Sequence, residues 1–213
     1  MKRLLILSFL CTIISSCASY IALPKDTTRF PHNRIKKQVK KGLIIATEDY
    51  SSARKSYRYF YRDIFDSGYI PLYICIGNKG KYEFAIRRKN ITLRFEDGKA
   101  VKAADFKKVI DDSKQSHAPA ILSFPLGIIP AFLIGHSITE ANDKLDQDYS
   151  QKAFHDSYVL KGDNLFGFLF FEVPQGKTRD SLKDATLEVN AIKKATSGEL
   201  AETLKFIVSI EQE

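Results

Sequence analysis

Short apolar segments separated by turn signals run from Gly42 to the end of this 213-residue chain, and they constrain its fold most. Most of these segments are rich in branched and aromatic residues, as strands are, and are too short for a typical helix. Asp97-Gly98 is a strong hairpin signal, and residues 77–80 and 197–198 form further turns. Seven or eight short strands at hairpin spacing predict a mainly β chain folded as an antiparallel β-sandwich. The expected strands cover residues 43–46, 69–76, 82–86, 91–96, 99–101, 164–173, 185–192 and 200–210.

Helical periodicity interrupts the strands and predicts two or three added helices. In residues 51–65 apolar side chains recur at helical spacing, and Gly68 is placed to end that helix. Residues 103–110 predict a second, short helix. Residues 137–140, Ser-Ile-Thr-Glu, have the form of a capping box, which favours a third helix reaching about Tyr149. The expected apolar stripe of this third helix contains Ile138, Ala141, Leu145 and Tyr149.

The segment 118–135 carries no charge and lies within an insertion, residues 103–155, that a minimal sandwich does not need. Its three prolines argue against one continuous helix, and therefore against a membrane-spanning one. Apolar burial favours packing this segment against the body, whereas unpaired backbone groups favour a wet or headgroup interface. We expect a mostly buried crossover with a partly exposed tip that contacts a membrane or a partner. The expected contact residues are Leu126, Ile128, Ile129 and Phe132.

The first seventeen residues have the layout of a secretory signal peptide. Lys2 and Arg3 precede an apolar run, residues 4–14, that is too short to cross a bilayer. The sequence Ile14-Ser15-Ser16-Cys17 resembles the bacterial lipobox, in which the peptide is cut before a cysteine that receives lipid. We therefore expect removal of residues 1–16 and lipidation of Cys17. The alternative is an ordinary cleaved signal followed by an incidental cysteine.

The excess positive charge of the chain lies close to this cysteine. The whole chain carries +8, and residues 25–41 hold seven basic residues against the single acid Asp26. Residues 17–41 show no sustained period and predict a basic tether, followed by a body over residues 42–213. Near an anionic membrane each lysine gains about 1 kcal/mol, so the tether is a candidate for anionic-surface contact; an extended, solvated linker is the alternative. The candidate lysines are Lys36, Lys37, Lys40 and Lys41.

The sequence contains no recognisable pattern for catalysis, metal binding or cofactor binding. The four histidines stand at no metal-ligand spacing, and HExxH, CxxC, GxSxG and phosphate-binding glycine motifs are absent. Cys75 lies in a strand-like apolar segment without a neighbouring base, which predicts a buried and inert thiol. We therefore expect a protein that is not an enzyme and that holds no cofactor or metal.

Three stretches carry a resemblance to a known family: residues 69–78, residues 91–98, and Gly162 with residues 167–174. They resemble the Ig-like β-sandwich domains of uncharacterised bacterial lipoproteins, which share an apolar strand ending in asparagine, an x-D-G hairpin and a final G-x-x-x-F-x-V-P strand. The match covers about residues 69–210, and the helix 51–65 and the insertion 103–155 depart from it. The resemblance implies a binding or scaffold module and supplies no active site.

Two functions of different class follow. The first is a membrane-anchored envelope lipoprotein that binds or scaffolds an envelope protein or the cell wall without catalysis. The second is a carrier or chaperone for a hydrophobic ligand held by residues 118–135. Ala18 follows the cysteine in place of the aspartate that retains many lipoproteins at the inner membrane, which predicts the outer membrane, facing the periplasm, in a two-membrane cell. Nucleic acid is not a plausible partner of an exported, anchored chain.

Overall fold

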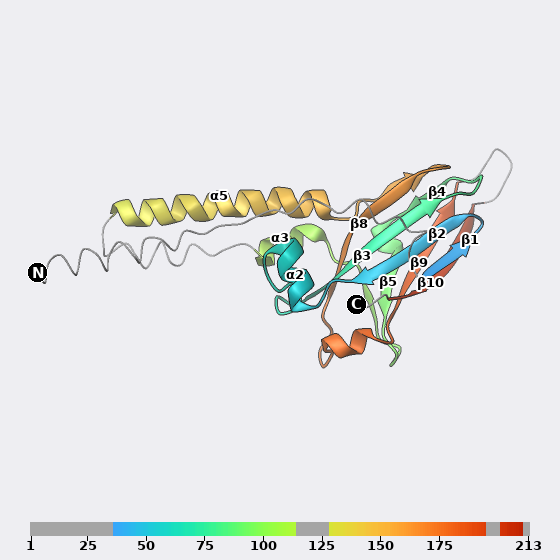
Figure 1. The fold of residues 1–213 in the computed structure, drawn as a ribbon, viewed down its shortest axis with the longest axis horizontal. Helices are drawn as coiled ribbons and strands as arrows, with labels where there is room; N and C mark the ends of the chain where they lie inside the picture. Colours follow the sequence, from blue (N-terminus) through green and yellow to red (C-terminus); the bar gives the residue numbers. More distant parts are fainter. Residues whose placement is uncertain (1–35, 114–127, 195–200, 211–213) are drawn as a thin grey trace, which may run out of the picture.

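A computed structural model of the chain describes residues 36–113, 128–194 and 201–210, with the backbone alone for residues 113 and 128–138. Two antiparallel sheets make up most of this part of the chain, which confirms the predicted mainly β, sandwich-like fold (Figure 1). The first sheet has the order β1-β2-β3-β8. Its strands are β1 (Lys37–Lys40), β2 (Leu43–Asp49), β3 (Tyr69–Asn78) and β8 (Asn164–Glu172).

The second sheet is organised around β9 (Thr186–Lys193). One edge of β9 pairs along its whole length with β10 (Glu202–Ser209). The other edge pairs with β5 (Ile91–Arg94) and β4 (Phe84–Ile86), which are separated by a 3-10 turn, η2 (Arg88–Asn90). β6 (Ala100–Lys102) then extends the sheet beside β5, and β7 (Ser157–Val159) beside β4. The hairpin predicted at Asp97-Gly98 is confirmed, with Gly98 at φ +84°.

Two apolar cores lie on opposite faces of the first sheet. Alternate residues of β3, including Ile74 and Ile76, face the second sheet, whereas Tyr73 and Cys75 face the helices. Because both faces are covered, all ten residues of β3 are buried. The prediction that Cys75 is buried is confirmed, at 1% exposure.

Three helices cover the outer face of the first sheet: α2 (Ala53–Phe60), α3 (Phe106–Ser113) and α5 (Ile128–Lys152) (Figure 1). A further 3-10 turn, η4 (Arg179–Leu182), precedes β9. The helix predicted over 51–65 is shorter than expected, because Tyr61 adopts a left-handed conformation with φ +58° and ends it. The residues beyond fold as a turn, in which the Ser56 hydroxyl accepts from the amide of Ile64 at 2.9 Å. Gly68, at φ +91°, therefore ends this turn and not the helix.

The start of α5 corrects a second expectation. The predicted capping box at residues 137–140 does not begin the helix, which starts at Ile128 and runs through it. Pro130 is compatible with this start because it lies in the first helical turn, where its missing N–H needs no partner. Residues 128–135 of the expected crossover are therefore helical, and residues 118–127 lie outside the described part. Within the described ranges, no helix is both long enough and apolar enough to cross a membrane.

The body begins earlier than expected, at β1 and not at Gly42. Lys37 to Lys40 pair with β2 in the register Lys37↔Ala46, so the last part of the predicted tether is a strand. The turn that follows uses Lys41 at φ +50° and Gly42 at φ +82°. A Cβ on Gly42 would lie 2.3 Å from the Cα of Gly80, so this close approach requires glycine. The sequence Lys-Gln-Val-Lys was missed as a strand because its apolar content is low.

Candidate functional site

The second half of α5 holds this helix to the body. Ala141, Leu145 and Tyr149, three members of the predicted stripe, are at most 4% exposed and lie on one helix face. The Tyr149 ring meets Phe60 of α2 edge-on, with ring centroids 5.3 Å apart. It lies parallel to Phe170 of β8, with centroids 6.2 Å apart. α5 is therefore fixed to both a helix and the first sheet.

A buried ion pair reinforces this attachment. The Lys152 ammonium lies 2.6 Å from an Asp148 carboxylate oxygen, with the two side chains 1% and 6% exposed. The same ammonium donates to the carbonyl of Tyr59 at 2.6 Å and lies 5.9 Å from the centre of the Phe60 ring. Burial lowers the pKa of Lys152, and the hydrogen bond to Asp148 opposes that shift. The pair therefore joins the last turn of α5 to the end of α2.

The chain then crosses β8 immediately after α5. The amide of Phe154 donates to the carbonyl of Phe168 at 2.8 Å, and Ala153 forms an isolated bridge to the same residue. Gly167 makes room for this crossing, because a Cβ at that position would lie 2.5 Å from the Cα of Phe154. The end of α5 is thus seated directly on the backbone of the first sheet.

A groove of about 530 Å³ lies between α3 and α5. Phe106, at the start of α3, meets His155, just beyond the end of α5, edge-on with ring centroids 5.6 Å apart. Phe106 and Ile110 supply apolar surface, and most of the other lining side chains are polar or acidic. The remaining lining residues are Lys107, Asp111, Asp143, Asp146, Gln147 and Ser150. Sequence reasoning missed this groove, because only the tertiary fold sets α3 beside α5.

The residues predicted to form an apolar contact lie on or before the free end of α5. Ile128, Ile129 and Phe132 belong to its first turns, whereas Leu126 lies outside the described residues. The first half of α5 extends beyond the sheets, away from the strands (Figure 1). Because residues 128–135 carry no charge, this end of the helix forms an uncharged arm. We call residues 128–135 the α5 arm.

Of the four lysines predicted to contact an anionic surface, Lys36 directly precedes β1, Lys37 and Lys40 lie on it, and Lys41 lies in the turn that follows. Alternate side chains from Lys36 onward reach the edge of β10 and the residue after it: Lys36 donates to the Ile210 carbonyl at 3.1 Å, and Gln38 accepts from the Ile207 amide at 2.7 Å. Lys40 donates to the Lys205 carbonyl, and Lys41 pairs with Glu202 at 2.6 Å. These contacts cover an exposed strand edge, a site where sheets otherwise associate. The linker alternative is therefore wrong for residues 37–41.

Beside these contacts, Lys36 and Lys37 line a groove of about 500 Å³ together with Lys183. Lys183 is paired with Asp180 at 2.7 Å, and Asp184 also lines the groove. Lys183 therefore faces an acid of its own chain, and Asp184 shares the groove with all three lysines. Contact between the predicted lysines and an anionic surface stays a prediction.

Side chains that could bind a metal or act in catalysis are dispersed in the described part of the chain. Across residues 36–113, 128–194 and 201–210, no three His, Cys, Asp or Glu side chains are grouped so as to hold a metal. His155 is exposed, with Nε2 2.8 Å from the Ser150 carbonyl oxygen. The phenol of Tyr69 donates to Asp112, and burial together with this acceptor raises the Tyr69 pKa. The absence of catalysis stays a prediction.

Comparison with known proteins gives weak likenesses. No protein-family model and no curated protein matches the sequence. Among solved structures, the yjhA protein of Bacillus subtilis is 10% identical, with a TM-score of 0.44 over 83% of this chain and 97% of its own. A candidate lipoprotein of the same species, ycdA, is 13% identical, with a TM-score of 0.35 over 81% of this chain and 38% of its own. A functionally unknown protein from Listeria monocytogenes is 16% identical, with a TM-score of 0.36 over 89% of this chain and 90% of its own. With every TM-score below 0.5, these likenesses assign no function to this chain.

Proposed function

We propose that this chain is a lipid-anchored protein of the cell envelope, attached through Cys17, whose Ig-like sandwich is a non-catalytic binding module. The first seventeen residues support the anchor, through their basic start, short apolar run and lipobox-like end. The shape of α5 supports the binding role. Its second half is packed on the body, whereas its first half is an uncharged arm extending beyond the sheets.

The α5 arm is the proposed contact. Its composition, Ile-Ile-Pro-Ala-Phe-Leu-Ile-Gly, gains about 25 cal/mol for each Å² of apolar surface that a partner removes from water. A helix presenting apolar residues to a groove is a common mode of protein recognition. The groove between α3 and α5 adds three carboxylates near the packed half of the helix: Asp111, Asp143 and Asp146. An envelope protein with an apolar groove and nearby basic residues is therefore the best fit.

A hydrophobic carrier is the weaker alternative. It requires residues 118–135 to enclose a ligand, as a lid or as the wall of a cavity. Residues 128–135, however, belong to a helix that extends away from the two cores. This geometry favours a surface contact over enclosure.

Replacing both Ile128 and Ile129 by serine tests the arm. The yield of cross-links between the lipidated protein and envelope proteins should fall at least tenfold, and the melting temperature should not change. The control replaces Glu140 and Lys144 by serine, an exposed pair on the packed half of the same helix. If the melting temperature fell strongly and cross-linking were retained, the arm would instead be part of a core.

The anchor is tested separately by Cys17→Ser. The variant should incorporate no labelled fatty acid and should leave the membrane fraction. Unchanged labelling and fractionation would exclude Cys17 as the lipid site, whatever the arm experiment shows.

A further inference from the structure

At the end of the sandwich opposite the α5 arm, four turns that carry exposed lysines meet. Asn78 joins two of its turns, since its side-chain amide donates to the carbonyls of Tyr82 at 2.6 Å and Val159 at 3.0 Å. The amide of Lys79 donates to the Gly42 carbonyl at 2.9 Å, which adds the β1–β2 turn. The amide of Lys194 donates to the Glu83 carbonyl at 2.9 Å, which adds the end of β9. Four turns that are distant in sequence therefore share one surface.

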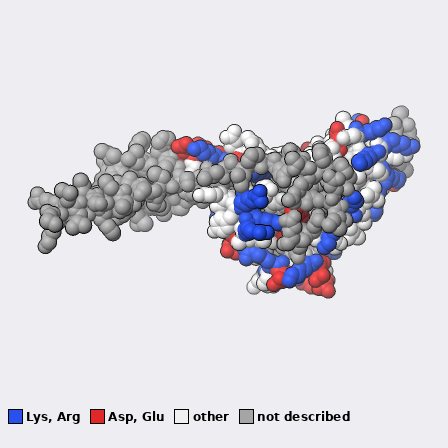
Figure 2. Space-filling model, in the orientation of Figure 1, with Lys and Arg blue, Asp and Glu red and all other residues white. Residues whose placement is uncertain are grey.

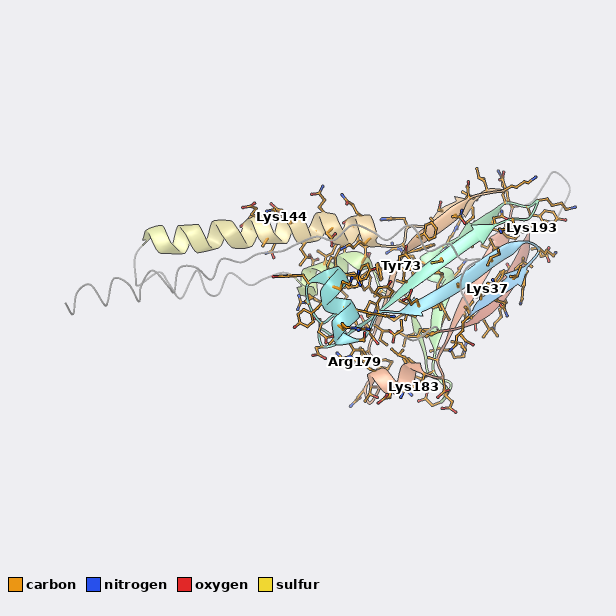
Figure 3. The ribbon with its side chains drawn as sticks, in the orientation of Figure 1. Lys37, Tyr73, Lys144, Arg179, Lys183 and Lys193 are labelled. Atoms are coloured by element: carbon orange, nitrogen blue, oxygen red, sulfur yellow. The ribbon has the colours of Figure 1, made fainter. Side chains whose placement is uncertain are left out.

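Each of these turns contributes exposed lysines, which together we call the lysine end. Its members are Lys40, Lys41, Lys79, Lys81, Lys161 and Lys194. Nearby acids offset only part of this charge: Glu202 pairs with Lys41 at 2.6 Å and Glu83 with Lys194 at 2.7 Å. The exposed Asp163 lies in the turn of Lys161, where its carboxylate accepts from the Leu160 amide at 2.9 Å. Basic side chains gather at the end of the sandwich away from α5 (Figure 2). Lys193 and Lys144, labelled in Figure 3, mark this end and α5 respectively.

Apolar side chains protrude beside these lysines. Leu160, next to Lys161, is 46% exposed, and Tyr158 on the neighbouring β7 is 57% exposed. Basic residues interspersed with a protruding aliphatic residue and a tyrosine suit a membrane interface, where lysines meet phosphates and the apolar tips enter the headgroup region.

We infer that the lysine end binds the anionic phospholipid headgroups of the membrane that carries the anchor. This inference rests on the proposed lipid anchor and adds an orientation to it. Extended at about 3.4 Å per residue, the residues between Cys17 and Lys36 reach about 60 Å, so the lysine end lies within range of the bilayer. With this end on the membrane, the α5 arm points away from it, toward a partner. The lysine end recognises the phosphate esters of lipid headgroups, and it binds them where they are part of a membrane surface.

Lysine footprinting tests this orientation on the unaltered, lipidated protein. The protein is reconstituted on phosphatidylcholine vesicles with or without 30% phosphatidylglycerol, and lysines are acetylated and quantified by mass spectrometry. Lys79, Lys81 and Lys161 should label several-fold more slowly on the anionic vesicles. Lys144 and Lys183, exposed and paired with an acid one turn away, should label equally on both. Equal labelling of all five lysines, with the fatty acid present, overturns the docking and leaves the anchor intact.

A matched pair of variants measures affinity without the anchor. In the Cys17→Ser chain with its signal removed, K79Q/K81Q/K161Q should bind anionic vesicles on the order of 100-fold more weakly, since each lysine contributes about fivefold. K102Q/K108Q/K144Q, at exposed positions outside both grooves, changes net charge equally and should bind as the parent does. If both triple variants lost the same affinity for anionic vesicles, binding would depend on net charge alone and the proposed local site would be wrong. Inorganic phosphate at 10 mM and constant ionic strength should displace no protein; displacement would indicate a free-anion site instead.

Discussion

Two lysines of α5 form the same kind of ion pair in different surroundings. Lys144 and Glu140 lie 2.7 Å apart, and both side chains are more than half exposed. Lys152 and Asp148 lie 2.6 Å apart, and both side chains are nearly fully buried. An exposed pair contributes little to stability, but removing one partner of a buried pair leaves an uncompensated charge in the interior. The two pairs therefore separate the effect of burial from that of pairing.

We predict that Lys152→Ala lowers the free energy of unfolding by about 3 kcal/mol, because it removes the buried ammonium that pairs with Asp148 at 2.6 Å. Lys144→Ala should change it by less than about 1 kcal/mol. Replacing both buried members, as Asp148→Leu with Lys152→Met, should recover most of the loss. Urea unfolding measures all three values, and equal effects of the two alanine variants would contradict the prediction.

The ion pairs of Glu188 on β9 make the stability of the fold depend on pH. Its carboxylate lies 2.9 Å from Lys205 on β10 and 3.3 Å from Arg94 on β5, and the Lys205 hydrogen bond is the main cause of its lowered pKa. Because the folded carboxyl holds its proton less tightly than the unfolded one, its contribution is present above about pH 4.5 and is lost as the pH falls through the folded pKa.

The Glu188→Gln variant should therefore lose less stability between pH 5 and pH 3 than the parent does. Thermal melts across this range measure the difference. Glu140→Gln, which changes an exposed carboxylate on α5, serves as the control and should retain the parent's acid sensitivity. Identical curves for Glu188→Gln and the parent would contradict the assignment.

At the scale of elements, the close crossing that follows α5 depends on one position in β8. Gly167 lies where residues 153–154 cross the strand, and no side chain fits between the two backbones. Gly167→Ala must therefore displace Phe154 from its hydrogen bond to Phe168.

We predict that Gly167→Ala costs about 2 kcal/mol, the typical cost of overpacking a buried contact. Asn164→Ala, at an exposed position of the same strand, should cost much less. Circular dichroism melts compare the two. If Gly167→Ala melts with the parent, the crossing can adjust and α5 is held by its side chains alone.

At the scale of the whole molecule, the two proposed contact regions lie at opposite ends of the long axis (Figure 1). The α5 arm extends from the helical layer, and the lysine end lies where the strand turns of both sheets meet. Substitutions in one region should leave binding by the other unchanged, because the effects of substitutions at distant sites with no shared partners add independently. A lipid-anchored protein built this way would hold its partner at a distance from its own membrane.

The sequence alone determined most of the strands, β1 and β7 excepted, and most of their turns. Short β-rich runs such as Tyr69–Asn78 and the Asp97-Gly98 hairpin are encoded locally, by side-chain shape and backbone preference, so they could be predicted. The stripe Ala141, Leu145 and Tyr149 was predictable for the same reason. The signal layout and Cys17 are also local patterns, but they lie outside the described residues.

Only the tertiary structure decided which distant segments meet. β1 was missed because its stability comes from pairing with β2 and from side-chain bonds to β10, not from its own residues. The early start of α5 at Ile128 was missed because a proline in the first turn reads locally as a helix breaker. Lys79, Lys161 and Lys194 are ordinary turn lysines in the sequence, and they form one surface because antiparallel pairing brings their turns to the same end. Periodicity and turn chemistry act over a few residues, whereas a contact surface depends on long-range packing.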